Sequence, residues 1–159
     1  MERDYQPIVV EVEQQITAQD ALARRMQVVV DRLWHHLHEK RVSWVGFYLK
    51  VSDRDEMVLG PHRDKPACSP IGMQGACGQA FVDKKALVFR NVKELGESYI
   101  ACDPRDQSEV VIPIYCDRSA QPCGVLDLDS FDIGAFDESD VEGLNRVLAV
   151  AGLKEKVSG

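Results

Sequence analysis

Cysteine is the residue type in this sequence with the clearest capacity for chemistry. Three of the five cysteines, Cys68, Cys77 and Cys102, stand in segments rich in glycine, proline, serine and aspartate, where buried structural thiols are least expected. A thiolate can accept an oxygen atom as a sulfenic acid, and a second cysteine can condense with that acid to form a disulfide. Cys102 is the candidate nucleophile, and Cys68, on another long loop, suits the second role. The alternative is that they are inert thiols, and Cys77 could simply pack beneath its loop.

Two aspartates near the C-terminal third alternate with leucines. In a strand, this spacing places Asp127 and Asp129 on one face and the leucines on the other. Acidic residues are depleted in strands, and the repulsion between two neighbouring carboxylates should raise at least one pKa toward the range of a proton donor. Glu109 opens the neighbouring predicted strand and could join the pair. The alternative is a solvated sheet face.

Two aromatic residues and two further cysteines fall in predicted strands. Trp44 and Tyr48 are four residues apart and therefore share a face, where they could enclose a methyl group or could be core aromatics. Cys116 and Cys123 end and begin neighbouring predicted strands, so we interpret them as core or cross-strand residues.

Histidine and cysteine do not form a recognisable metal motif. The sequence has no Cys-x-x-Cys pair, and His35, His36 and His38 lie beside or opposite the apolar stripe of a predicted helix. His62, next to a proline, is interpreted as a solvated loop residue. We therefore expect no metal and no other cofactor.

The first third of the chain predicts a helix and a hairpin. Apolar residues recur at helical spacing over residues 10–39, which predicts an amphipathic helix with one buried face. The stripe consists of Leu22, Met26, Val29, Leu33 and Leu37. Residues 43–51 and 56–59 are rich in β-branched and aromatic side chains and predict two strands around a polar turn, with the second ended by Gly60-Pro61.

The middle of the chain predicts two long loops. Residues 61–78 and 91–107 are irregular, and loops of this length in a compact domain usually carry function. Between them we expect a short helix near residues 79–83 and a strand at 86–89.

The last third predicts a second hairpin and a final helix. Strands are expected at residues 109–116 and 123–129, and a helix should follow Asp137 as N-cap, with Phe136 and Val141 forming a hydrophobic staple. Its buried face should consist of Val141, Leu144, Leu148 and Ala151, with the end near Lys154. The order of elements predicts an α+β fold, with a largely antiparallel sheet flanked by N- and C-terminal helices.

Composition and charge exclude several classes of protein. With 159 residues and 45% hydrophobic content, we expect one domain over residues 1–159. The net charge is -7, without a basic cluster that would bind nucleic acid. The sequence shows neither a signal peptide nor an apolar run that could span a membrane, so a cytoplasmic location is expected.

Seven short segments, taken in order, resemble the GAF-domain free methionine-(R)-sulfoxide reductases. They are Trp44-Val45-Gly46-Phe47-Tyr48-Leu49, Leu59-Gly60-Pro61, Lys65-Pro66-Ala67-Cys68, Gly75-Ala76-Cys77-Gly78, Ile100-Ala101-Cys102-Asp103, Ser108-Glu109-Val110-Val111 and Gly124-Val125-Leu126-Asp127-Leu128-Asp129-Ser130. The similarity extends from about Val42 to Leu148. It implies a GAF-like domain that reduces the free amino acid with thioredoxin as reductant, and a homodimer is plausible by analogy.

The resemblance also implies roles for individual residues. Cys102 matches the catalytic cysteine, Cys68 the recycling cysteine and Cys77 an auxiliary one. Trp44 and Tyr48 match the residues that form the aromatic wall of the family's active site. Glu109, Asp127 and Asp129 match the family's acidic substrate contacts. Glu109 and Asp129 would polarise the sulfoxide oxygen, and Asp127 would bind the ammonium group of the substrate.

The sequence departs from the family pattern at four places. The interval between Cys68 and Cys77 is one residue shorter, and Phe-Gly-Arg is replaced by Gly72-Met73-Gln74. Gln107 stands where an arginine is expected, and Tyr99 where histidine is common. The loop that carries Cys68 and Cys77 could therefore differ in shape.

Two other classes of function compete with the reductase. A non-catalytic GAF module would bind a small ligand or mediate dimerisation, and fold alone never establishes activity. A redox sensor resembling a thiol peroxidase would use Cys102 but would not need the acidic cluster.

Overall fold

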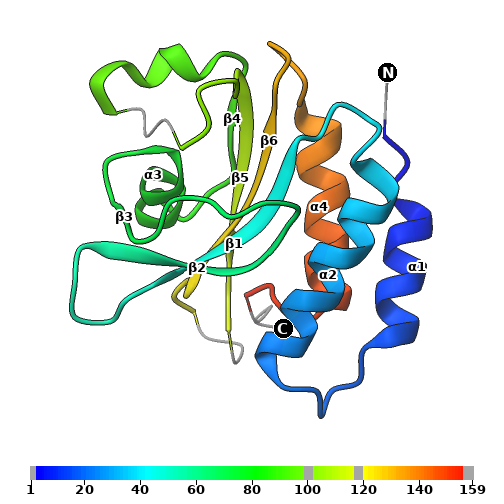
Figure 1. Cartoon of the computed structure of the whole chain (residues 1–159). Coiled ribbons are helices and arrows are strands. Elements are labelled where there is room, and N and C mark those ends of the chain that lie inside the picture. The colour runs from blue at the N-terminus through cyan, green and yellow to red at the C-terminus, as the bar shows by residue number, and fades with distance from the viewer. Residues whose placement is uncertain (1–2, 99–101, 117–119, 156–159) are drawn as a thin grey trace.

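Six strands form one antiparallel sheet, with the order β3-β2-β1-β6-β5-β4 across it. The computed structural model of the chain describes residues 3–98, 102–116 and 120–155 (Figure 1). The strands are β1 (Trp44–Lys50), β2 (Glu56–Arg63), β3 (Ile71–Gly72), β4 (Leu87–Phe89), β5 (Ser108–Ile114) and β6 (Gly124–Ser130). Strand β5 is buried along its whole length, because both faces of the sheet centre are covered.

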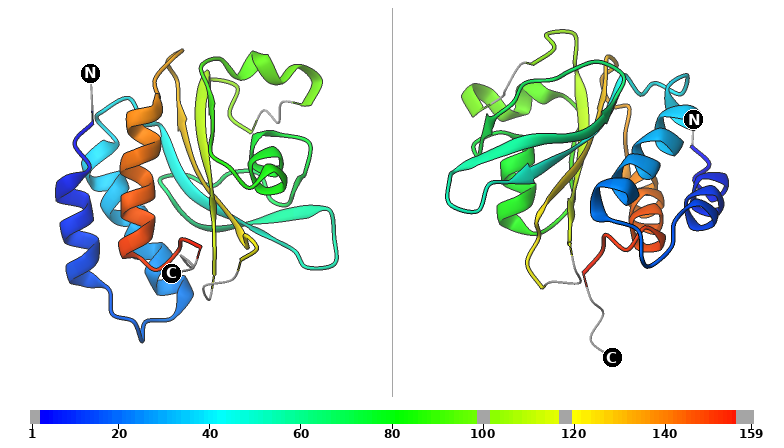
Figure 2. Two further views of the ribbon diagram at one scale, coloured as in Figure 1. Left: turned by 180° about the vertical axis from the view of Figure 1, so that it is seen from behind. Right: turned by 60° about the horizontal axis from the view of Figure 1, so that its bottom comes forward.

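Helices cover the two faces of the sheet unequally. Helices α2 (Leu22–Leu37) and α4 (Glu138–Val150) pack on one face, and α1 (Gln6–Gln15) packs outside them (Figure 2). Helix α3 (Ala76–Asp83) packs on the other face against β5 and β6, and the 3-10 segment η1 (Val92–Ser98) lies on the same side (Figure 1). The predicted α+β fold is confirmed, with the terminal helices together on one face.

Each face of the sheet has its own apolar core. Leu126 and Leu128 are fully buried beneath the helices, whereas Val111 and Val125 belong to the core on the α3 side. The alternation along β6 therefore directs the leucines to the helix layer and the aspartates to the opposite face, as the sequence predicts.

The single helix predicted over residues 10–39 is wrong, because residues 16–21 separate α1 from α2. Ile16 has an extended backbone, and the Asp20 side chain accepts a hydrogen bond of 2.8 Å from the backbone N–H of Thr17. Such a local bond competes with the helical ladder. The turn lets α1 fold back against α2. Four residues of the predicted stripe are buried and Leu22 is partly buried.

Strand β2 continues through Pro61 to Arg63, beyond the predicted end. Its register with β1 shifts between Gly46 and Tyr48. An irregularity of this kind tolerates proline, which has no N–H to donate to the ladder. The interpretation of His62 as a solvated loop residue is therefore also wrong, because it lies in β2 and is half-buried.

Helix α3 begins earlier than predicted. Gly75 is its N-cap and Ala76 its first residue, so Cys77 lies in the first helical turn and not in the preceding loop. Within the described ranges, none of the helices combines the length and apolar character that crossing a membrane requires.

The hairpin of β5 and β6 is closed at its turn by a disulfide. Cys116 follows β5 and Cys123 precedes β6, just outside the strands that they were predicted to end and begin, and their Cα atoms are 5.8 Å apart. Both are half-buried and pack against the core under the helices. The bond therefore ties together the ends of the strands that carry Glu109 and Asp127.

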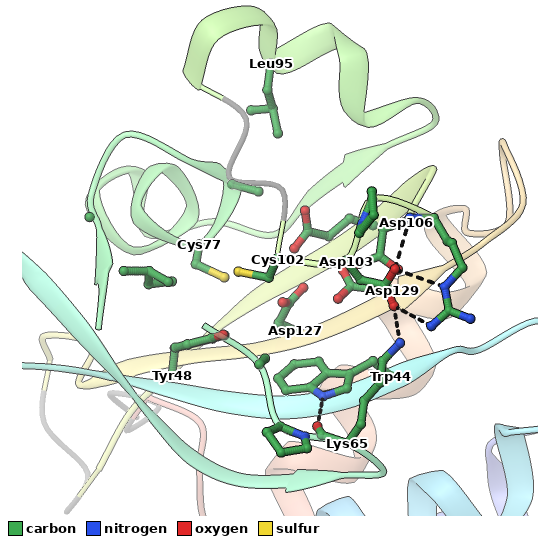
Figure 3. A pocket seen from close by; sticks show the side chains of 18 residues that line it. Trp44, Tyr48, Lys65, Cys77, Leu95, Cys102, Asp103, Asp106, Asp127 and Asp129 are labelled. Atoms are coloured by element: carbon green, nitrogen blue, oxygen red, sulfur yellow. Dashed lines mark hydrogen bonds and ion pairs between the residues drawn. The ribbon is translucent and has the colours of Figure 1, made fainter. Parts of the chain in front are cut away.

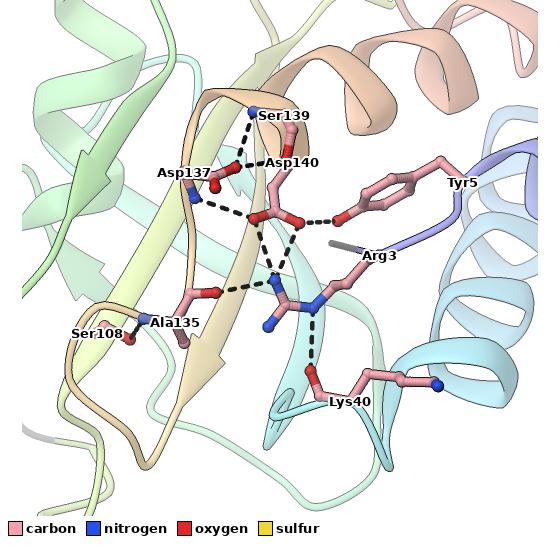
Figure 4. Close-up of polar contacts among 8 residues, drawn as sticks. All are labelled: Arg3, Tyr5, Lys40, Ser108, Ala135, Asp137, Ser139 and Asp140. Carbon is pink, nitrogen blue, oxygen red and sulfur yellow. Dashed lines mark hydrogen bonds and ion pairs between the residues drawn. The ribbon is translucent and has the colours of Figure 1, made fainter. Parts of the chain in front are cut away.

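The N-terminus is fixed to the start of α4 by a buried polar network (Figure 4). The Asp140 carboxylate accepts hydrogen bonds from Arg3 Nη1 at 3.0 and 3.1 Å and from the Tyr5 hydroxyl at 2.7 Å. The Asp137 N–H donates to the same carboxylate and completes a capping box, which confirms Asp137 as the N-cap. The Arg3 and Asp140 side chains are only 4% and 3% exposed.

Replacing Asp140 with alanine is expected to lower the free energy of unfolding by about 3 kcal/mol, since it leaves the buried Arg3 guanidinium without its counter-ion and the Tyr5 hydroxyl without its acceptor. Urea unfolding followed by circular dichroism measures the change. The exposed Glu138 of the same turn is the matched control, and its replacement with alanine should change stability by about 0.5 kcal/mol or less. Equal effects of the two substitutions would contradict the assigned role of the network.

Candidate active site

A pocket of about 430 Å³ opens on the α3 side of the sheet (Figure 3). Strands β1, β5 and β6, the first turn of α3 and the loops that carry Lys65 and Cys102 surround it. Seven of the eight predicted site residues line it: Trp44, Tyr48, Cys77, Cys102, Glu109, Asp127 and Asp129. The eighth, Cys68, is joined to this group through a disulfide.

Cys68 and Cys102 form that disulfide although 34 residues separate them. Their Cα atoms are 5.5 Å apart, and both residues are exposed. The two long loops that the sequence singles out therefore meet at the mouth of the pocket. A dithiol from solution can reach the bond directly.

The carboxylates of β5 and β6 gather on the pocket side of the sheet. Glu109 pairs in register with Asp129, and Asp127 lies two residues before Asp129 in β6. Glu109 and Asp127 are buried, at 8% and 4% exposure. Burial, followed by repulsion among the three groups, raises each pKa well above its usual range, so these carboxyls hold protons more tightly than exposed ones do.

One oxygen of the cluster has no partner. The Oδ1 atom of Asp127 is buried and accepts no hydrogen bond from the described residues. An unsatisfied buried acceptor is costly. The two cations that line the pocket, Lys65 and Arg105, both pair with Asp103 instead. The pocket therefore presents an acceptor suited to a donor from outside the chain.

Cys77 is the free thiol of the chain and is buried beside this cluster. Its sulfur and oxygens of Glu109 and Asp127 all lie within 4.8 Å of one another. Burial and then the neighbouring carboxylates raise the pKa of the thiol well above its usual range, which keeps it protonated and a poor nucleophile. By distance alone a small cation could bridge the three groups, and the expectation of no metal stays a prediction.

Two aromatic side chains form one wall of the pocket and also hold the loop of Cys68. The Trp44 and Tyr48 rings are 6.0 Å apart between centroids. Trp44 Nε1 donates to the carbonyl of Lys65, and the Tyr48 hydroxyl donates to the carbonyl of Cys68, both at 2.8 Å. The His62 ring stacks on Trp44 at 6.0 Å, a contact that sequence reasoning missed.

An ion pair joins the two cysteine loops. Asp103 accepts hydrogen bonds from Arg105 and from Lys65 (Figure 3), and these two cations lower its pKa. Sequence reasoning gave these residues no role. The available signal was their spacing, because Lys65 stands three residues before Cys68 and Arg105 three after Cys102.

Of the departures from the family pattern, those at residues 72–74 and 107 lie in the described part of the chain. Gly72 lies in β3 and lines the pocket, and the Gln74 carbonyl accepts a hydrogen bond from the side chain of Gln79 in α3. The Gln107 side chain donates to the Phe131 carbonyl at 3.0 Å. Tyr99 and the first two residues of the Ile100-Ala101-Cys102-Asp103 motif lie outside the described residues.

Comparison with known proteins places the chain in a family, although no family model matches it. It is 35% identical over 147 residues to protein YtsP of Bacillus subtilis, which covers 91% of this chain and 86% of that protein. It is 37% identical over 110 residues to the free methionine-R-sulfoxide reductase of Escherichia coli, covering 68% of this chain and 63% of that protein.

Solved structures agree with this placement. The free methionine-R-sulfoxide reductase of Neisseria meningitidis, solved in complex with its substrate, has a TM-score of 0.82 at 28% identity and covers 95% of this chain and 90% of its own. A solved GAF domain has a TM-score of 0.83 at 27% identity. The class of the protein is therefore a GAF domain with an acidic, cysteine-lined pocket. Within that class, the chain belongs to the free methionine-R-sulfoxide reductases.

Proposed function

We propose that this chain reduces free methionine-(R)-sulfoxide to methionine, with Cys102 as the nucleophile and Cys68 as the resolving cysteine. The observation that carries the proposal is the Cys68–Cys102 disulfide at the mouth of a pocket whose inner side holds three carboxylates. This pairing provides the nucleophile, the resolving thiol and the proton donors in one place.

The pocket matches the groups of a free amino-acid sulfoxide. The unpartnered Oδ1 of Asp127 accepts a hydrogen bond from the α-ammonium group. Glu109 and Asp129, kept protonated by burial, donate to the sulfoxide oxygen and make the sulfur more electrophilic. Trp44 and Tyr48 enclose the S-methyl group. A peptide-bound methionine sulfoxide has no free ammonium and is therefore expected to be a poor substrate.

The chemical steps balance with two thiols. The Cys102 thiolate attacks the substrate sulfur, the oxygen is transferred to Cys102 as a sulfenic acid, and methionine leaves. The Cys68 thiol then attacks the Cys102 sulfur, and water leaves as the disulfide forms. A dithiol protein of the thioredoxin class supplies two electrons to restore both thiols. A homodimer and a cytoplasmic location stay predictions.

The test is an assay of the purified chain with dithiothreitol or thioredoxin on each epimer of free methionine sulfoxide. We expect methionine to form from the R epimer and little from the S epimer. Equal rates with both epimers, or no product from either, would sink the proposal.

The alternative of a non-catalytic GAF sensor accounts for the fold but gives no role to the exposed disulfide. A redox sensor gives that disulfide a role but leaves the unpartnered acceptor of Asp127 without one. The reductase uses both features, so it is the function that the geometry supports best.

The pH dependence should respond to Asp106, which lines the same pocket and whose pKa is raised by burial to about 6. Above that pH its negative charge raises the pKa of Glu109 and of Asp129. Replacing Asp106 with asparagine removes the charge, so both donors should lose their protons at lower pH. The alkaline limb of the pH profile of kcat/KM is expected to move to lower pH. The exposed Asp53 is the control, and Asp53→Asn should leave the alkaline limb in place. An unchanged alkaline limb in Asp106→Asn would contradict this coupling.

A further inference from the structure

Beside the pocket mouth, the loop between β6 and α4 exposes two apolar side chains. Phe131 is 37% exposed and Ile133 is 50% exposed. The other large exposed apolar residues in the described part of the chain, Val10, Val58 and Val82, stand singly on α1, β2 and α3. Single exposed apolar side chains need no explanation, whereas a cluster beside a functional site marks a candidate interaction surface.

The loop is held in place by bonds to its backbone from several elements. The Phe131 carbonyl accepts from the Gln107 side chain at 3.0 Å, and the Asp132 carbonyl accepts from the Ser108 hydroxyl. The Gly134 N–H donates to the carbonyl of Arg90 at 2.7 Å. The side chain of Arg41 donates to the Asp132 carboxylate at 2.9 Å. A surface fixed before binding loses little conformational entropy when a partner docks.

Two cations connect this loop with the disulfide. Lys65 Nζ lies 5.1 Å and the Arg105 guanidinium 4.5 Å from the centre of the Phe131 ring. Both cations also line the pocket, and each is three residues away from one of the bonded cysteines. Phe131, Lys65 and Arg105 therefore connect the loop to the exposed Cys68–Cys102 bond, and we call these three residues and Ile133, two positions after Phe131, the patch.

On the side of the patch that faces the disulfide the exposed charge is positive, although the chain carries a net charge of -7, and the exposed Asp132 between Phe131 and Ile133 is paired with Arg41. The side chains of Arg105 and Lys65 are 64% and 38% exposed, whereas their shared partner Asp103 is 13% exposed. A molecule approaching the disulfide therefore meets cations and apolar groups first. Such a surface complements an apolar contact face rimmed by carboxylates.

We propose that this patch docks the dithiol protein that reduces the Cys68–Cys102 bond, through an apolar face with acidic residues around it. The inference rests on the proposed reductase function. In the docked complex, one partner thiolate attacks a sulfur of the exposed bond and forms a mixed disulfide, releasing the other enzyme thiol. The second partner thiol then resolves the mixed disulfide. The partner leaves as a disulfide and the enzyme as two thiols.

The test compares a protein reductant with a small one. At saturating free methionine-(R)-sulfoxide, rates are measured against the concentration of reduced thioredoxin and, separately, of dithiothreitol. Ile133→Asp and Phe131→Ala are expected to raise the KM for thioredoxin by about 10-fold or more, as for central interface residues. The rates with dithiothreitol should remain those of the wild type, because a small dithiol needs no docking surface. Val10→Asp, at 42% exposure on α1, is the matched control and should change neither.

The possible outcomes separate the docking proposal from the function on which it rests. A wild-type KM for thioredoxin in both patch variants would overturn the docking surface, as would an equal loss with both reductants. A wild-type enzyme that uses dithiothreitol but not thioredoxin would also overturn it, while the reductase function would stand. Inactivity of the wild type with both reductants would refute the reductase function itself. Thermal unfolding of each variant shows that the comparison is between folded proteins.

Discussion

Replacing Cys102 with serine is expected to abolish even a single turnover of free methionine-(R)-sulfoxide. A serine hydroxyl is a weak nucleophile and cannot take up the sulfoxide oxygen as a sulfenic acid does. Cys77, the other thiol in the pocket lining, is kept protonated by burial and by its carboxylate neighbours and cannot substitute. The loss should be on the order of 10⁴-fold or more, as for removal of other catalytic nucleophiles.

Replacing Cys68 with serine should leave the first turnover intact and stop the second. The Cys102 sulfenic acid would form but would have no cysteine at disulfide distance, and thioredoxin would have no disulfide to reduce. Quenched-flow measurement should give about one methionine per enzyme, and mass spectrometry should find one added oxygen on Cys102. Normal cycling of Cys68→Ser on thioredoxin would show that another thiol resolves the intermediate, with Cys77 next in order. Cys116→Ser is the control and should cycle normally.

Local patterns in the sequence were enough to predict the parts of the fold that depend on local physics. The alternation along residues 126–129 correctly placed Asp127 and Asp129 on one face. The capping signal at Asp137 gave the start of α4, because an N-cap bond involves residues only a few positions apart.

Features that depend on distant contacts could not be predicted in this way. The break at residues 16–21 contains neither glycine nor proline, and it depends on the Asp20 side chain and on packing between α1 and α2. Strand β2 extends past Pro61 because β1 accommodates a shift in register. The spacing of apolar residues along the sequence predicts neither the break between α1 and α2 nor the length of β2.

The same distinction applies to the candidate site. Residue types and the family resemblance indicated eight positions, of which seven line one pocket and Cys68 is bonded to one of those seven, while their individual roles stay predictions. The Lys65–Asp103 ion pair and the stacking of His62 on Trp44 were missed, because each joins segments that meet only in the folded chain. The unpartnered oxygen of Asp127 was equally invisible, since it depends on which donors the fold leaves out of reach.

Neutralising Asp127 and removing the Asp129 carboxyl are expected to have separable effects, although the two residues neighbour each other on one strand face. Asp127→Asn should mainly weaken binding, because a charged hydrogen bond to an ammonium group contributes about 1.5 to 3 kcal/mol. The KM for free methionine-(R)-sulfoxide should therefore rise by about 10- to 150-fold with little change in the rate at saturation.

Removal of the Asp129 carboxyl should instead slow the chemical step. Asp129 pairs with Glu109 across β5 and β6 and shares the buried cluster, so its protonated carboxyl is placed to donate to the sulfoxide oxygen. Asp129→Ala should lower the single-turnover rate at saturating substrate by about 100-fold or more, the scale for a positioned proton donor. Asp129→Asn retains a donor and should lose less.

An N-acetylated substrate distinguishes the two roles further, since it has no ammonium group. With the acetylated substrate, Asp127→Asn should weaken binding little further, because acetylation and the substitution remove the same interaction. Asp129→Ala should slow reduction of the acetylated substrate as much as reduction of the free amino acid. Single-turnover rates over a range of concentrations for the four combinations of variant and substrate measure these couplings. Near-wild-type rates for both variants with the free amino acid would mean that the acidic pair is only a polar sheet face, and would favour the sensor over the reductase.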